Sequence, residues 1–222
     1  MSRIWRKLVM GNQPVCYIFG AGEYYNPPLV QPNPCDLVIA ADGGYLYTQK
    51  FKIVADIVLG DFDSLSKPPK EDIKTIILPR EKDDTDMLAA IREGWQRGFR
   101  TFHLYGGTGG RLDHTMANIQ CIAYLAYHGG RGYLFDRNFT ITAIHNDSIV
   151  LPASLKGTVS VFSHSGMATG VSIKGLKYTL DNGKLDNTYP IGISNEFVGV
   201  VSSISVENGT LVIMYSNDIV EI

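Results

Sequence analysis

The chain has 222 residues, of which 45% are hydrophobic and 19% charged, an ordinary composition for a globular protein with a sizeable core. Its formal net charge of −2 gives no bulk electrostatic reason to bind nucleic acid, and no apolar stretch is long enough for a signal peptide or a transmembrane helix. The cysteines Cys16, Cys35 and Cys121 follow no CxxC pattern, which favours a reducing compartment. We therefore expect a cytoplasmic protein that binds neither nucleic acid nor membranes.

The first half of the chain alternates short apolar runs with helical patterns. The predicted strands, in chain order, are Val15–Phe19, Leu37–Ala41, Ile53–Leu59, Thr75–Leu78, Phe102–Tyr105 and Tyr133–Phe135. Between them, Thr85–Arg97 and Asp113–His128 carry apolar residues at spacings of three and four, which predicts two helices. This alternation predicts an α/β domain with a mostly parallel, Rossmann-like sheet and flanking helices.

After about residue 138 the helical spacing disappears and β-branched residues, serine and glycine dominate. We predict strands at Thr158–Phe162, Phe197–Val201 and Thr210–Tyr215, with turns at Asp181–Gly183 and Glu207–Gly209. Short strands at this spacing indicate an all-β sandwich. The expected organisation is an N-terminal extension, an α/β domain and a sandwich domain, at residues 1–14, 15–138 and 139–222.

Two carboxylates, Asp61 and Asp63, follow a predicted buried strand. In an extended segment, residues two apart point to the same side, and Gly60 permits a close approach. Two like charges this close are costly unless a cation lies between them, and oxygen-only ligands suit magnesium. We expect a magnesium–nucleotide site at the carboxyl end of the sheet, although an isolated Asp-x-Asp is more often a solvated turn.

A second acidic cluster, Asp83–Asp86, stands at the start of a predicted helix. Acids at this position can simply cap the helix and oppose its dipole, which suits Asp83 or Asp84. Arg80 and Lys82 precede the cluster, and a phosphate site needs this mixture of carboxylates and cations.

A glycine-rich segment, Gly106–His114, lies between a predicted strand and a helix. Its backbone N–H groups can surround a phosphate, Arg111 adds a planar cation, and Asp113 adds a carboxylate. The segment lacks the Gly-Lys-Ser/Thr ending of a Walker A sequence and is not GxGxxG. His114 at a helix start is more often structural than catalytic.

Two other loops give weaker signals. In Asp42-Gly43-Gly44, the glycines let the backbone approach a ligand and Asp42 could meet a ribose or a metal-bound water, but a plain turn fits equally well. Gly192–Phe197, in the β-rich half, is by itself a turn containing a Ser-Asn pair.

Taken together, these segments resemble the thiamine pyrophosphokinase family, in one order from about residue 15 to the end of the chain. The matching stretches are Ala41–Gly44, Gly60–Leu65, Glu81–Asp86, Gly107–Thr115, Asn118-Ile119 and Gly192–Phe197. The resemblance implies transfer of pyrophosphate from ATP to the hydroxyethyl group of thiamine, with AMP as the second product. It also implies Mg²⁺ and a homodimer whose site lies between the α/β domain of one subunit and the sandwich of the other.

The resemblance also implies roles for individual residues. The metal or metal-water ligands would be Asp61, Asp63 and Asp86. The contacts to the diphosphate and the metal shell would be Thr85, Arg111 and Asp113. Of these, Arg111 and Asp113 would also be catalytic. The nucleotide contacts would be Asp42, Gly43, Gly44, Lys82, Asp83, Thr85, Thr108 and Gly109. The thiamine contacts, supplied by the partner subunit, would be Ser194 and Asn195.

Three questions stay open at this stage. No general base is evident, and Asp113 or Asp63 is the best candidate. The same acids would also serve a magnesium-dependent phosphohydrolase that transfers the phosphate to water. A non-catalytic sensor of thiamine or a nucleotide is a third interpretation, which the complete set of acids disfavours.

Overall fold

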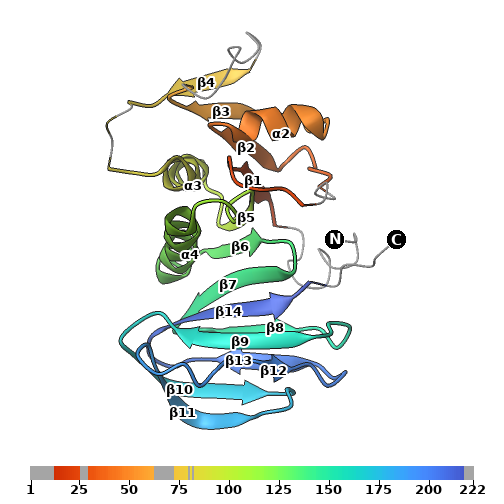
Figure 1. The fold of residues 1–222 in the computed structure, drawn as a ribbon, viewed down its shortest axis with the longest axis vertical. Coiled ribbons are helices and arrows are strands. Elements are labelled where there is room, and N and C mark those ends of the chain that lie inside the picture. Colours follow the sequence, from red (N-terminus) through yellow and green to blue (C-terminus); the bar gives the residue numbers. More distant parts are fainter. Residues whose placement is uncertain (1–12, 26–29, 63–72, 80, 82, 218–222) are drawn as a thin grey trace. The chain divides into compact units, whose positions relative to one another are not determined.

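Figure 1 shows the protein as a computed structural model, which describes residues 13–25, 30–62, 73–79, 81 and 83–217. These residues form two compact units. One unit holds residues 13–121 and 134–136, and the other holds residues 122–133 and those from 137 onward. The domain boundaries at residues 14 and 138 stay predictions. No helix in the described ranges is both long and apolar enough to cross a membrane.

The first unit is built on a parallel sheet with the strand order β5-β1-β2-β3-β4. The strands are β1 (Val15–Phe19), β2 (Leu37–Ala41), β3 (Ile57–Gly60), β4 (Lys74–Ile77) and β5 (Thr101–Tyr105). Every residue of β1 and β2 is buried, as expected for central strands covered on both faces. The predicted mostly parallel sheet is confirmed. The next strand, β6 (Arg131–Phe135), divides between the two units.

The helices are α2 (Gly44–Lys50), α3 (Asp86–Gln96) and α4 (Leu112–Tyr127). In Figure 1, α2 and α3 lie on opposite faces of β1 and β2. Alternation along β1 explains this, because Val15, Tyr17 and Phe19 share a core with Tyr45 of α2, whereas Cys16 faces α3. The two predicted helices are confirmed as α3 and α4, whose ends differ by one residue from the prediction.

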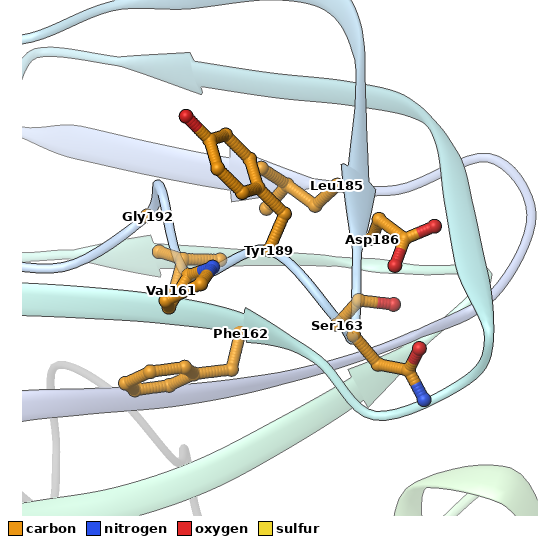
Figure 2. Close-up of a pocket in the computed structure, with 9 residues that line it drawn as sticks. Val161, Phe162, Ser163, Leu185, Asp186, Tyr189 and Gly192 are labelled. Atoms are coloured by element: carbon orange, nitrogen blue, oxygen red, sulfur yellow. The ribbon is translucent and has the colours of Figure 1, made fainter.

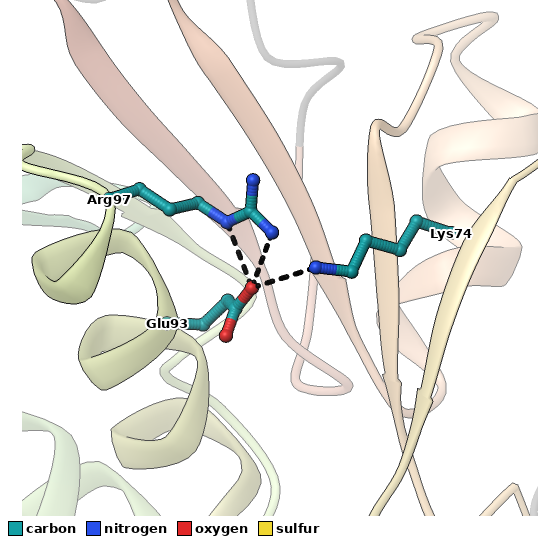
Figure 3. Close-up of polar contacts among 3 residues, drawn as sticks. All are labelled: Lys74, Glu93 and Arg97. Atoms are coloured by element: carbon teal, nitrogen blue, oxygen red, sulfur yellow. Dashed lines mark hydrogen bonds and ion pairs between the residues drawn. The ribbon is translucent and has the colours of Figure 1, made fainter.

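Three charged side chains connect α3 to the edge strand β4 (Figure 3). Glu93 accepts two hydrogen bonds from Arg97, at 2.8 and 2.7 Å, and a longer one from Lys74 at 3.4 Å. Burial tends to raise the pKa of Glu93, but the hydrogen bonds from Arg97 and Lys74 outweigh it and hold that pKa below its usual value. The carboxylate therefore stays charged at neutral pH.

The second unit contains two antiparallel strand arrangements, β12-β9-β14-β7 and β11-β10-β13-β8. Their strands are β7 (Phe139–His145), β8 (Ser148–Leu151), β9 (Thr158–Ser163), β10 (Met167–Lys174), β11 (Leu180–Asp186), β12 (Asn195–Glu196), β13 (Ser202–Ser205) and β14 (Thr210–Ser216). Buried residues of both arrangements belong to one hydrophobic cluster, which includes Val161 and Ile213 of the first and Val171 and Ile204 of the second. The second unit therefore contains antiparallel strands of two sheets that share one core.

Two predictions for this half are wrong. Phe197–Val201 forms no strand beyond an isolated bridge at Phe197; Gly199 has φ +79° and the three valines of this segment are exposed. Asp181–Gly183 is not a turn but lies within β11, where Asn182 at φ +48° accompanies register shifts in the pairing with β10. The predicted turn at Glu207–Gly209 is confirmed between β13 and β14.

Candidate active site

The carboxyl ends of the parallel strands bring the predicted loops to one edge of the first unit's sheet. Asp42 follows β2, Asp61 follows β3, and Gly106 follows β5. The chain runs β1 to β4 in one direction and then returns to place β5 on the other side of β1. Ligands of open α/β sheets bind outside the carboxyl ends of the strands at such a reversal. The region outside the carboxyl ends of β1 and β5 is therefore the expected ligand position.

Asp42 is held in an uncommon backbone conformation beside the end of β3. Its N–H donates to the carbonyl of Leu59 at 2.7 Å, and its φ is +48°. A Cβ added to Gly60 would lie 3.0 Å from the Cα of Asp42, so glycine permits this close approach. Gly44 has a packing reason of its own, because its Cβ would lie 1.9 Å from the carbonyl oxygen of Phe19.

The acidic loop after β3 departs from the expected geometry at its middle residue. Phe62 has φ +61°, a left-handed conformation that costs a bulky residue on the order of 1–3 kcal/mol. The assumption that residues 61–63 are extended is therefore wrong, and strand alternation cannot place Asp63 relative to Asp61. Asp61 is half-buried, and Asp63 lies outside the described residues.

The start of α3 is capped by Thr85 rather than by Asp83 or Asp84, which corrects the expected cap. The Thr85 Oγ1 accepts a hydrogen bond from the N–H of Leu88 at 3.2 Å, and Asp84 instead pairs with Arg92. Because that contact uses the oxygen as an acceptor, the hydroxyl proton of Thr85 can still be donated to a phosphate. Asp86 stands in the first turn of the helix. Lys82 and Arg80 lie outside the described residues.

The glycine-rich loop after β5 turns through left-handed conformations. Gly106, Gly109 and Gly110 have φ +63°, +79° and +61°. Two side-chain hydrogen bonds hold the loop in place. Asn118 Nδ2 donates to the carbonyl of Gly107 at 2.7 Å, and Thr108 Oγ1 donates to Asp136 Oδ1 at 2.6 Å. The Thr108 side chain is thus buried against Asp136, so its side chain is not the group that would contact a nucleotide. Sequence reasoning missed Asp136, which is 28 residues away.

Arg111 and Asp113 form an exposed ion pair at the start of α4. Arg111 Nη2 lies 2.5 Å from Asp113 Oδ2, and Nε lies 3.1 Å from Oδ1. The hydrogen bonds between these side chains raise the pKa of Arg111 and lower the pKa of Asp113. Both groups are therefore charged at neutral pH, and the guanidinium is near the amino end of a 16-residue helix, where anions are stabilised.

The donor atoms at this edge suit a hard cation. Asp61 and Asp86 offer only oxygen, which Mg²⁺ prefers over the nitrogen and sulfur ligands typical of zinc. Within the described ranges, no three His, Cys, Asp or Glu side chains are grouped closely enough to hold a metal ion. Asp63, the third carboxylate expected in this set, lies outside those ranges.

In the second unit, the two predicted thiamine contacts differ in their surroundings. Asn195 is 6% exposed; its Oδ1 accepts from the N–H groups of Tyr178 and Glu196, each at 2.9 Å, and its Nδ2 donates to the Tyr178 carbonyl at 2.7 Å. Ser194 is exposed and has φ +57°. The Asn195 side chain therefore fixes the loop that presents Ser194.

A small cavity of about 40 Å³ lies beside the same loop (Figure 2). Gly192 lines it, and a Cβ there would lie 2.0 Å from the carbonyl oxygen of Val161. Asp186 and Tyr189 also line it. The volume suits about one water molecule and is too small for a thiamine ring.

Comparison with known proteins gives consistent matches along the chain. A family model described as "Thiamin pyrophosphokinase, catalytic domain" matches residues 32–133, and one described as "Thiamin pyrophosphokinase, vitamin B1 binding domain" matches residues 146–211. The thiamine pyrophosphokinase of Bacillus subtilis is 25% identical over 188 residues, which are 82% of this chain and 88% of that protein. Thiamin pyrophosphokinase 1 of Caenorhabditis elegans is 27% identical over 179 residues, which are 74% of this chain and 72% of that protein.

Solved structures agree in fold. The crystal structure of thiamin pyrophosphokinase from Geobacillus thermodenitrificans has a TM-score of 0.79 at 25% identity, covering 94% of this chain and all of that one. A thiamin pyrophosphokinase family protein from Enterococcus faecalis has a TM-score of 0.78 at 27% identity, covering 93% of this chain and all of that one.

Proposed function

This chain belongs to the thiamin pyrophosphokinase family, and on that premise we propose how its residues carry out the reaction. The enzyme transfers pyrophosphate from ATP to the hydroxyethyl group of thiamine. The thiamine hydroxyl oxygen forms a bond to the β-phosphorus, and the bond from that phosphorus to the α,β-bridging oxygen breaks. The bridging oxygen leaves with AMP, and the hydroxyl proton passes to a base. The observation that carries this conclusion is the ordered match of both family domains over most of the chain.

The ATP phosphates bind at the loop after β5. Backbone N–H groups of this loop, in which Gly109 and Gly110 are left-handed, contact the phosphates, and the amino end of α4 and the Arg111 guanidinium add positive charge. Thr85 donates its hydroxyl proton to a phosphate oxygen, and Thr108 and Gly109 contribute backbone contacts. The remaining proposed nucleotide contacts are Asp42, Gly43, Gly44, Lys82 and Asp83.

Asp61, Asp63 and Asp86 are the residues that would hold Mg²⁺. When bound, the ion supplies positive charge for the oxygens of the transferring pyrophosphoryl group. Two of the three carboxylates follow β3 or open α3 at the same edge as the glycine-rich loop, which supports this assignment. Catalysis of this kind depends chiefly on positioning and electrostatic stabilisation.

Arg111 and Asp113 change partners when ATP binds. In the structure the guanidinium is bonded to Asp113, and phosphate oxygens offer Arg111 a more highly charged partner. Loss of those hydrogen bonds raises the basicity of Asp113, because they hold its pKa low. Asp113 then accepts the thiamine proton; Asp63 is the alternative base.

Thiamine binds against Ser194 of a second copy of the chain in a homodimer. The second unit exposes apolar side chains near this residue, which supports an intermolecular surface; they are Ile191, Ile193, Val198, Val200 and Val201. The three cysteines are free, which supports a reducing, cytoplasmic location.

Incubation of the purified protein with ATP, Mg²⁺ and thiamine, with products separated by mass, tests the function. Equal amounts of thiamine diphosphate and AMP are expected. Phosphate release in the absence of thiamine would support a phosphohydrolase instead. Thiamine binding without any product would support a sensor.

A further inference from the structure

The loop after β1 is hydrogen-bonded to the glycine-rich loop, although no motif in the sequence predicts this contact. Three backbone hydrogen bonds join them: Gly20 N–H to the Tyr105 carbonyl at 2.8 Å, Gly22 N–H to Gly106 at 2.8 Å, and Glu23 N–H to Thr108 at 2.9 Å. The Glu23 side chain also lies over Gly109, where an added Cβ would come within 2.6 Å of it. The two loops flank the strand reversal between β1 and β5.

Tyr24 secures this junction. Its hydroxyl donates to the carbonyl of Gly20 at 2.9 Å, with the carbonyl of Tyr105 3.3 Å away as a second acceptor. Its ring covers Gly106, where an added Cβ would lie 2.4 Å from the nearest ring carbon. The residue therefore contacts the last residue of β5 and the first glycine of the loop at once.

The ring of Tyr24 is itself held by aromatic neighbours. It stacks on Tyr47 of α2 with centroids 4.1 Å apart, and Phe51 packs against it at 5.6 Å. Burial raises the pKa of the Tyr24 hydroxyl, so it remains a proton donor throughout the neutral range. The phenol is thus fixed at both its apolar and its polar end.

We propose that Tyr24 is a positioning residue for the nucleotide: it holds the glycine-rich loop in the left-handed conformation that receives the phosphates. This inference rests on the proposed nucleotide site. Phosphate binding by a preformed loop avoids the cost of ordering it, so loosening the anchor weakens nucleotide binding. Thiamine binding does not depend on this anchor.

The test compares Tyr24→Phe with Tyr47→Phe in the full chain. Tyr24→Phe removes the one hydroxyl proton that is donated to Gly20, with Tyr105 as its second acceptor, and keeps the stacked ring. Tyr47→Phe removes the hydroxyl of the ring that stacks on Tyr24. Calorimetry measures the binding of α,β-methylene-ATP in the presence of Mg²⁺. This analogue cannot donate pyrophosphate, because its α,β-bridging methylene group is not cleaved. Steady-state KM values for ATP and for thiamine are measured separately.

Tyr24→Phe is expected to raise the Kd for the analogue and the KM for ATP about fivefold, the factor expected for one lost hydrogen bond, and to leave the KM for thiamine unchanged. Tyr47→Phe is expected to change neither. A lower unfolding temperature with an unchanged Kd would reduce Tyr24 to a structural residue and overturn the inference.

Two outcomes separate the inference from the proposed function. If the wild-type protein binds the analogue but makes no thiamine diphosphate, the function fails while the Kd of Tyr24→Phe still decides the inference. If the wild-type protein binds no nucleotide, both are overturned.

Discussion

The replacement Asn195→Ala separates a structural from a direct role of this residue in thiamine binding. The change deletes three hydrogen bonds of a side chain that is 6% exposed and leaves the N–H and carbonyl of Tyr178 without these partners. Each bond contributes about 0.5–1.5 kcal/mol, and because Tyr178 and Glu196 are exposed, water can replace part of the loss. We expect the free energy of unfolding to fall by about 2 kcal/mol.

For a chain of this size, that loss corresponds to a fall of roughly 4–8 °C in the unfolding temperature. Ser194→Ala is the matched control, because this neighbour is exposed and the replacement keeps a Cβ at its φ of +57°. Ser194→Ala should raise the KM for thiamine and leave the unfolding temperature unchanged, whereas Asn195→Ala should change both. Thermal unfolding and steady-state kinetics measure the two effects. An unfolding temperature unaffected by Asn195→Ala would refute the structural role of this side chain.

Three further predictions concern the first unit. Asp86→Asn should lower turnover at least about 100-fold, as loss of a group that stabilises transition-state charge does, with an unchanged circular dichroism spectrum; wild-type turnover would exclude Asp86 as a metal ligand. Glu93 has a folded pKa below its usual 4.5, so its stabilising contribution is complete above that value and disappears as the pH falls through the folded pKa. Glu93→Gln should therefore cost about 0.5–1 kcal/mol at pH 7 and progressively less as the pH is lowered below 4.5 in urea titrations, and a cost that does not change with pH would contradict this origin. Gly109→Ala forces a Cβ onto Glu23 at φ +79° and should weaken ATP binding about tenfold or more in a calorimetric titration, whereas Gly98→Ala, at φ +91° in open space, should affect only stability.

Much of the first unit could be predicted because its signals are local. The strands β1 and β2 are continuous apolar runs bounded by glycine, proline or aspartate, and their limits agree with the prediction. The helices α3 and α4 are long enough to show the 3.6-residue period in their apolar residues. Helix α2 has only seven residues, which are too few to show that period.

The errors and omissions arise where non-local contacts decide the conformation. Phe62 adopts a left-handed backbone that no propensity of phenylalanine suggests, and Val198–Val201 carry strand-forming residues that have no paired neighbour strand among the described residues. Asp136 and Tyr24 act through partners 28 and up to 81 residues away, so no spacing in the sequence connects them to the glycine-rich loop.

The most direct test of the central claim follows the pyrophosphoryl group itself. ATP labelled with ¹⁸O at the non-bridging oxygens of its β- and γ-phosphates is incubated with the enzyme, Mg²⁺ and thiamine, and both products are analysed by mass spectrometry. A single-step transfer predicts that all label appears in thiamine diphosphate and none in AMP, with no thiamine monophosphate at early times. Thiamine monophosphate accompanied by labelled ADP would contradict the account, because it would show transfer of one phosphoryl group rather than attack at the β-phosphorus.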